Sequence, residues 1–168
     1  MPYRNRLTAA RLRKEIKYFP KTGKFVRISS RSHKAPVGSN PCSLTFYGYH
    51  TISVGGTRYQ ASRLAWLYMT GRHPKFDIDH KDGNKTNNKF SNLRDVKRRV
   101  NLENFKRAKS NNKSTGLLGV YLRKDTGKFS AKITVCGKPL QLGCFNTAEG
   151  AARAYLNAKR LLHKGYVL

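Results

Sequence analysis

The sequence is poor in acidic side chains. Its 168 residues include 35 Lys and Arg but only eight Asp and Glu, which gives a formal net charge of +27 at pH 7. A compact chain with this charge repels itself unless it works against a polyanion. The shortage of acids therefore predicts nucleic acid as the partner.

Long apolar runs and paired cysteines are also lacking. No stretch approaches the 18 apolar residues of a membrane span, and the opening MPYRNRLTAARLRKE has no apolar run of the secretory kind, so we expect a cytoplasmic protein without membrane association. The cysteines are odd in number and form no C-x-x-C pair, which argues against a disulfide framework and a structural zinc site. We expect Cys42, Cys136 and Cys144 to be small buried residues.

The first part of the chain predicts short helices and hairpins. Thr8 is placed to cap a helix through Tyr18, and a strand is expected near residues 24 to 28. Gly55-Gly56 joins two strand-like runs, and SRLAWLYMTG (62–71) has the apolar density of a helix ending at Gly71. Beyond a polar loop, Leu93, Val96 and Val100 suggest a helical stripe.

The last part predicts a second module. KSNNKSTG is a polar segment without periodicity, typical of a linker. Three strands (119–123, 128–135, 139–145) and a helix from Ala148 to His163, capped by Thr147, follow it. The expected apolar stripe of this helix consists of Ala151, Ala154, Tyr155, Ala158, Leu161 and Leu162. We therefore expect an α+β protein. Its predicted parts are an N-terminal region (1–43), a central domain (44–108), a linker (109–115) and a C-terminal domain (116–168).

The central strand of this second module alternates strictly. Apolar residues from Phe129 to Val135 alternate with polar ones, so one face of the sheet is apolar and the other is polar. If the helix covers the apolar face, the polar face remains available to bind a partner. An ordinary solvated face is the plain alternative, but the excess of positive charge favours docking in the major groove of DNA. The candidate DNA-binding residues are Tyr121, Arg123, Lys128, Ser130, Lys132, Thr134 and Gln141.

The segment LGCFNTAEGAARAYLNA, within residues 115 to 165, resembles the Apetala-type DNA-binding domain of plant ethylene-response factors, which also occurs in phage and bacterial endonucleases. The resemblance implies a three-stranded sheet that docks in the major groove. Phe129 stands where plant members usually have Trp, and the strands carry fewer arginines, so the family's target sequence is not carried over.

Half of the acids gather in one stretch, DIDHKDGNKTNNKFSNLRD (77–95). Within it, Asp79 offers an oxygen ligand for a hard cation beside His80, which can take a proton, and this pairing suits hydrolysis. The alternatives are a calcium loop, which Lys81 and Asp82 disrupt, a zinc site, for which His73 is the only other candidate ligand nearby, and a plain turn.

The wider pattern DIDHKDGNKTNNKFSNLRDVKRRVNLENF resembles the HNH endonuclease motif of phage and intron homing enzymes, a strand–loop–helix metal fold, over about residues 44 to 105. The resemblance implies that His80 is the general base and that Asn92 bonds across the loop to hold its geometry. It implies Asp79 and Asn101 as ligands of one Mg²⁺ or Mn²⁺ ion. Asn104 is a competing ligand, one helical turn further on.

Basic residues follow the motif. Lys97, Arg98 and Arg99, with Lys106, Arg107 and Lys109, are expected to contact phosphates. Together these features predict a metal-dependent DNA endonuclease, a monomer on double-stranded DNA that cuts one strand per engagement, of a site-preferring nicking or homing type from a phage or mobile intron. The main alternative is a non-catalytic DNA-binding regulator on a decayed nuclease fold, and a weaker one is an RNA-binding or packaging protein.

Overall fold

A computed structural model describes the chain except residues 1–6, 31–34, 106–107, 109–111 and 168. The chain divides into two compact units, Met1–Lys97 and Arg98–Leu168, each described by itself. Small antiparallel sheets and short helices make up both, which confirms the predicted α+β class. In the described part of the chain, no helix is long and apolar enough to span a membrane.

The first unit opens with helix α1 (Ala9–Glu15), followed by strands β1 (Ile16–Phe19) and β2 (Lys24–Arg27). The hydroxyl of Thr8 accepts a hydrogen bond from the Arg11 backbone N–H at 3.2 Å, so the predicted cap is confirmed. The predicted helix was too long, because the chain becomes extended at Ile16. Alternate residues of β1 are buried there, as a β-branched and aromatic run favours.

The next three strands form one sheet: β3 (Cys42–Leu44), β4 (His50–Val54) and β5 (Thr57–Gln60), with β4 in the middle. The predicted hairpin at Gly55-Gly56 is confirmed, and so is the helix after it, α2 (Ala61–Thr70), whose C-cap is the left-handed Gly71. Helices α1 and α2 and these strands enclose the core of the unit, which consists of Leu7, Ala9, Leu12, Ile16, Tyr18, Phe25, Ile52, Val54, Ala61, Leu64, Ala65, Leu67 and Leu93.

A hairpin completes the first unit. Strand β6 (Asp77–His80) pairs antiparallel with β7 (Leu93–Val96), and a long loop with the 3-10 turn η1 (Phe90–Asn92) joins them. The helical stripe expected from Leu93 onward was wrong over β7, where pairing with β6 buries Leu93. Helix α3 (Arg98–Glu103) begins only in the second unit.

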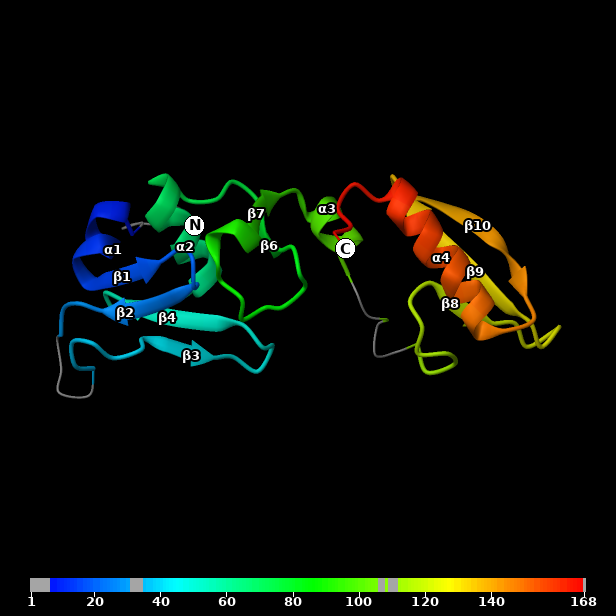
Figure 1. Ribbon diagram of the computed structural model, residues 1–168, viewed down its shortest axis with the longest axis horizontal. Helices are drawn as coiled ribbons and strands as arrows, with labels where there is room; N and C mark the ends of the chain where they lie inside the picture. The colour runs from blue at the N-terminus through cyan, green and yellow to red at the C-terminus, as the bar shows by residue number, and fades with distance from the viewer. Residues whose placement is uncertain (1–6, 31–34, 106–107, 109–111, 168) are drawn as a thin grey trace. The chain divides into compact units, whose positions relative to one another are not determined.

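The second unit has a three-stranded sheet in the order β10-β9-β8, formed by β8 (Val120–Leu122), β9 (Phe129–Val135) and β10 (Lys138–Phe145). Helix α4 (Ala148–Leu162) lies across one face of this sheet, as predicted (Figure 1). Thr147 caps it by accepting a hydrogen bond from the Gly150 N–H at 3.1 Å.

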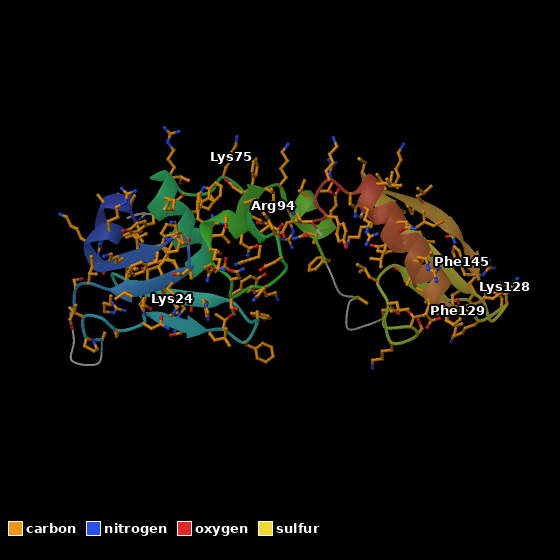
Figure 2. All side chains as sticks on the ribbon, in the orientation of Figure 1. Lys24, Lys75, Arg94, Lys128, Phe129 and Phe145 are labelled. Atoms are coloured by element: carbon orange, nitrogen blue, oxygen red, sulfur yellow. The ribbon has the colours of Figure 1, made fainter. Side chains whose placement is uncertain are left out.

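The core of this unit lies between helix and sheet. Its buried residues are Val120, Ala131, Ile133, Ala151 and Tyr155. Phe129 and Phe145, directly paired across β9 and β10, pack against them (Figure 2). The apolar stripe of α4 was predicted correctly at Ala151 and Tyr155.

The far end of α4 departs from the predicted stripe. Leu161 is 84% exposed and Leu162 41%, whereas Lys159 is buried. The Lys159 ammonium group donates a hydrogen bond to the backbone oxygen of Phe105 and lies 4.9 Å from the centre of the Tyr166 ring. These partners compensate the charge for its loss of water.

Two of the three cysteines were wrongly expected to be buried. Cys136 and Cys144 are exposed, and Cys42 is partly buried. A β-bulge between Gln141 and Gly143 shifts the register of β10, so that Cys144 pairs with Ser130 on the polar face. An extra residue in one strand reverses which face the following side chains occupy, and the alternation of the sequence does not reveal it.

Candidate active site and nucleic-acid interface

The β6–β7 hairpin places Asp79 and His80 at the end of a strand, where a short apolar-acidic run gives way to a polar loop. In the register, Asp79 lies opposite Arg94 and His80 opposite Leu93. Both side chains of the Asp-His pair are buried, with 7% of Asp79 and 4% of His80 exposed. A buried carboxylate and a buried imidazole need compensating partners, and those partners define the site.

The partner of Asp79 is Arg94, which projects from β7 (Figure 2). Its guanidinium nitrogens Nε and Nη2 lie 2.8 and 2.7 Å from Oδ2 of Asp79. This ion pair compensates the buried side chain of Asp79 for its loss of contact with water. No role was predicted for Arg94.

The partner of His80 is Asn88, also buried. Nε2 of His80 lies 3.2 Å from Oδ1 of Asn88. Nδ2 of Asn88 lies 3.3 Å from the backbone oxygen of Thr86, a pure acceptor, and 3.5 Å from Nδ1 of His50. The amide nitrogen therefore faces Thr86 and the amide oxygen faces His80.

This orientation assigns the protons of the imidazole. Because Oδ1 of Asn88 only accepts, Nε2 of His80 carries the hydrogen and Nδ1 carries the lone pair. Burial lowers the pKa of His80 below its ordinary value, although the bond to Asn88 and the nearby Asp82 and Asp79 work in the opposite direction. The ring is consequently neutral at neutral pH and able to accept a proton.

Asn88 is itself fixed by the N-terminal hairpin. The Tyr18 hydroxyl donates to the Asn88 backbone oxygen at 2.7 Å, in the interior of the unit. Two residues on, the N–H of Phe90 donates to the backbone oxygen of Pro20 at 3.0 Å, and the Phe90 ring lies 5.6 Å from that of Trp66. The segment that holds His80 is thus anchored at both ends.

Asn92 spans the loop between β6 and β7. Its Nδ2 donates to Oδ1 of Asp82 at 3.0 Å and to the Asn87 backbone oxygen at 2.9 Å, while its Oδ1 accepts from the Asp82 N–H at 3.1 Å. Hydrogen bonds from the side chain of Asn87, the backbone of Asn84 and the side chain of Asn92 lower the pKa of Asp82, although desolvation acts to raise it. Asn92 therefore acts on the loop that follows His80.

A further carboxylate of the acidic stretch has a structural role. Asp95 accepts hydrogen bonds from the backbone N–H groups of Lys75 and Phe76, both at 2.7 Å, and so fixes the entry into β6. Together with Asp82, which shapes the loop, it accounts for part of the clustering of acids in a basic chain.

Asn101 and Asn104, the two candidates for the last position of the motif, lie in the second unit. Asn101 is partly buried on α3, and Asn104 follows the helix. Asn104 is buried, and its Oδ1 accepts a hydrogen bond from the Val167 N–H at 3.3 Å. Its amide oxygen is thus engaged with the end of the chain.

The predicted DNA-binding residues of the second unit share one face of the sheet. The register sets Tyr121 opposite Ser130 and Gln141 opposite Lys132, and the face is turned away from the core that α4 covers. Gln141 donates to the Ser130 hydroxyl at 2.7 Å, and Arg123 pairs with Asp125, a contact that the sequence analysis did not foresee. Ser130 is partly buried, and the other predicted DNA-binding residues of this face are exposed: Tyr121, Arg123, Lys128, Lys132, Thr134 and Gln141.

Three of the basic residues after β7 are exposed. Lys97 lies just before α3, and Arg98 and Arg99 lie in its first turn. Lys106, Arg107, Lys109 and part of the predicted linker 109–115 lie outside the described residues. Among the described residues, no three His, Cys, Asp or Glu side chains are grouped to hold a metal ion. The metal ligands predicted from the sequence, the Asp79 carboxylate and the Asn101 amide, do not form a group of that kind, because an amide is not one of those side chains.

Comparison with known proteins finds a family match that includes the hairpin. Residues 59–103 match the family described as HNH endonuclease. Over 62 residues the chain is 40% identical to DNA endonuclease I-HmuI of Bacillus phage SP01, an alignment that spans 34% of this chain and about a third (36%) of that relative's length. The predicted resemblance to HNH endonucleases is thereby confirmed for this segment.

A solved structure titled "DNA binding and cleavage by the HNH homing endonuclease I-HmuI" aligns with 91% of this chain and 90% of its own, with 25% sequence identity and a TM-score of 0.42. The predicted Apetala-type character of the second unit stays a prediction.

Proposed function

We propose that this protein is a metal-dependent DNA endonuclease that hydrolyses phosphodiester bonds, of a site-preferring nicking or homing type. The observation that carries the proposal is the buried His80, held through Nε2 by Asn88 beside the buried carboxylate of Asp79. This arrangement lies in the segment that matches HNH endonucleases, on a chain with a net charge of +27.

In this proposal His80 is the general base. Its Nδ1 takes a proton from the water that attacks the phosphorus, and Asn88 stabilises the imidazolium through the bond to Nε2. Asn92 keeps the loop after His80 closed, which fixes the direction of the ring. Removal of a general base typically costs 10²- to 10⁴-fold in rate, so about that loss is expected without His80.

The chemistry of the predicted ligands suits a hard cation. Asp79 and Asn101 offer carboxylate and amide oxygens, the donors that Mg²⁺ and Mn²⁺ prefer, and Mg²⁺ commonly takes few protein ligands. A bound ion would supply Lewis-acid stabilisation of the charge that develops on the phosphate and the leaving oxygen.

The polar sheet face of the second unit is proposed to hold duplex DNA. Its lysines and its arginine suit phosphates and guanine edges, and its hydroxyl and amide groups can bond further base edges. With one HNH segment, a monomer would cut one strand per engagement. The relative in Bacillus phage SP01, named as a DNA endonuclease, supports the choice of DNA.

The test is conversion of supercoiled plasmid and phage or host DNA to open circles or linear product, with Mg²⁺, with Mn²⁺ and with chelator. We expect cation-dependent nicking that His80→Ala abolishes while DNA binding persists. Binding without any cutting, across DNA that includes genomic substrates, would favour the non-catalytic regulator instead.

The ligand assignment has its own test. Asn101→Ala should shift the cation concentration needed for half-maximal cutting upward and leave DNA binding nearly unchanged. The matched variant Asn104→Ala should chiefly destabilise the second unit, because it removes the acceptor of the Val167 N–H. An unchanged cation titration for Asn101→Ala would transfer the role of ligand to Asn104.

A further inference from the structure

The turn between β3 and β4 exposes two aromatic rings to solvent. Phe46 is 98% exposed and Tyr47 75%, and the preceding Leu44 is 65% exposed. The two rings contact each other edge to face, with centroids 5.5 Å apart. Isolated apolar residues on a surface are common, but a contiguous aromatic pair at the end of a hairpin marks a contact surface. We refer to Phe46 and Tyr47 as the aromatic tip.

Hydrogen bonds hold the aromatic tip in a defined shape. The Thr45 N–H donates to the Tyr49 backbone oxygen at 2.9 Å, and the Tyr49 N–H donates to the Thr45 hydroxyl at 3.1 Å. Gly48 closes the turn in the left-handed conformation (φ 79°), and its N–H donates to the Thr45 backbone oxygen at 2.9 Å. The rings are thus presented on a closed hairpin turn, which lowers the entropic cost of binding through them.

The aromatic tip is also tied to the candidate active site within the same unit. The ammonium group of Lys85, in the β6–β7 loop, donates to the Tyr47 backbone oxygen at 3.1 Å and lies 4.8 Å from the centre of the Tyr49 ring. The Tyr49 ring is in turn 6.2 Å from that of His80. The hairpin that carries the exposed rings therefore borders the proposed general base and is contacted by a lysine of the β6–β7 loop.

We propose that the aromatic tip stacks on DNA bases beside the phosphodiester that faces His80, with Phe46 inserted between neighbouring bases as a wedge. This inference rests on the proposed function for the identity of the partner. Every base offers a flat π-face, so an exposed ring can stack without sequence preference, and inserted apolar side chains unstack base steps and kink the duplex. Lys85 and the positive charge of the chain match the phosphates on either side.

The experiment uses a plasmid fragment and the full-length protein in chelator, so that nothing is cut. Binding is measured by titration, and unstacked thymines are mapped by permanganate oxidation. The variants are Phe46→Ala, Phe46→Trp as the conservative replacement, and Leu161→Ala as a control for loss of another highly exposed apolar side chain, in the second unit. Because Phe46 is almost fully exposed, its replacement leaves the core intact.

We expect the wild type to create reactive thymines and Phe46→Ala to lose them, with affinity lower by about 5- to 150-fold, the usual range for one base–aromatic stack. Phe46→Trp should restore both properties, and Leu161→Ala should leave both unchanged. Reactive thymines that persist in Phe46→Ala, or a wild type that binds without producing any, would overturn the wedge.

Cutting of the same fragment with Mg²⁺ or Mn²⁺, measured in parallel, separates the two proposals. If cutting depends on the cation but Phe46→Ala binds DNA as well as the wild type does, the wedge proposal is wrong and the nuclease proposal stands. If thymine reactivity toward permanganate depends on Phe46 but the wild type does not cut, the nuclease proposal is wrong and the wedge proposal stands. Absence of DNA binding by the wild type overturns both.

Discussion

The contact between the His80 ring and the side-chain amide of Asn88 decides which ring nitrogen carries the hydrogen. Nε2 faces the amide oxygen of Asn88, so the lone pair belongs to Nδ1. An amide oxygen fixes the tautomer without adding a negative charge, unlike the carboxylate that orients histidine in many hydrolases. The ring therefore keeps the lowered pKa that its burial imposes.

Replacing Asn88 by Ala should lower the cutting rate by about 10- to 100-fold, the usual cost of losing an outer partner that orients a site residue. DNA affinity should stay within about twofold, since Asn88 is buried and away from solvent. Single-turnover cutting and binding titration measure the two effects. Asn40→Ala, an exposed amide whose Oδ1 accepts from the Cys42 N–H in the same unit, is the matched control. Equal losses in both variants would contradict the assigned role of Asn88.

The pH dependence of cutting follows from the lowered pKa of His80. The neutral imidazole is the active form, so kcat/KM should stay level as the pH falls to the ordinary value of 6.5 and decline only below it. The free energy of unfolding should decline in the same window, because the unfolded state takes up the proton at a higher pH than the folded state. A pH–rate profile with its acidic inflection above 6.5 would contradict this prediction.

At this scale the sequence singled out a candidate pair of residues but not the residues that support it. The Asp79-His80 pair stood out because acids are scarce in the chain, and the segment around it matches HNH endonucleases. Asn88 and Arg94 were missed. Asn88 acquires its role from Tyr18, 70 positions away, and from the tertiary approach to His80, neither of which leaves a periodic signal in TNNK.

At the scale of elements, the β1–β2 turn acts as a support for the loop that holds His80. Gly23 in this turn has φ +74°, and a Cβ built there would lie 2.5 Å from the Lys89 nitrogen and 2.6 Å from the Asn88 carbonyl carbon. Only a residue without a side chain permits this approach. The hairpin thus reaches the backbone of the residue that fixes the imidazole.

Gly23→Ala should therefore destabilise the first unit by about 2–4 kcal/mol, combining the cost of a left-handed L-residue with that of the collision. Gly38→Ala is the matched control, because φ is +85° there but nothing lies within 4 Å of the added carbon, so about 1 kcal/mol is expected. Denaturant unfolding followed by Trp66, the single tryptophan, compares the two. Equal destabilisation would show that the turn does not press on the loop.

Sequence periodicity predicted most elements, and its failures have physical causes. It found α2, the hairpin at Gly55-Gly56 and α4, where caps and apolar spacing agree. It extended a helix over Leu93 and Val96, because an apolar pair three apart fits a helix as well as a short strand. Pairing with β6 decides in favour of the strand.

At the scale of the whole molecule, we expect DNA binding to depend more on where the positive charges lie than on the net charge. On the sheet of the second unit, Lys128 and Lys132 lie on the face opposite the core, whereas Arg153 and Arg160 are exposed on the helix that covers the other face. Net charge alone attracts any polyanion over long range, but only residues that reach phosphates release bound counterions.

The double variant Lys128→Ala/Lys132→Ala should weaken DNA binding and reduce the slope of log affinity against log salt by about two, one for each lost phosphate contact. The charge-matched variant Arg153→Ala/Arg160→Ala should change the slope little. Binding titrations over a range of NaCl concentrations measure both. A larger effect of the arginine pair would place the DNA on the helical side of the unit.

The bulge in β10 also places a native cysteine where it can be cross-linked to bound DNA. By reversing the face on which Cys144 lies, it sets a native thiol among the residues proposed to touch DNA, 3.7 Å from the Arg123 guanidinium. A thiol-tethered oligonucleotide can exchange into a mixed disulfide with such a cysteine, trapping a transient complex covalently. With Cys136, the other exposed thiol, replaced by Ser, the protein is suited to site-directed cross-linking without any engineered cysteine.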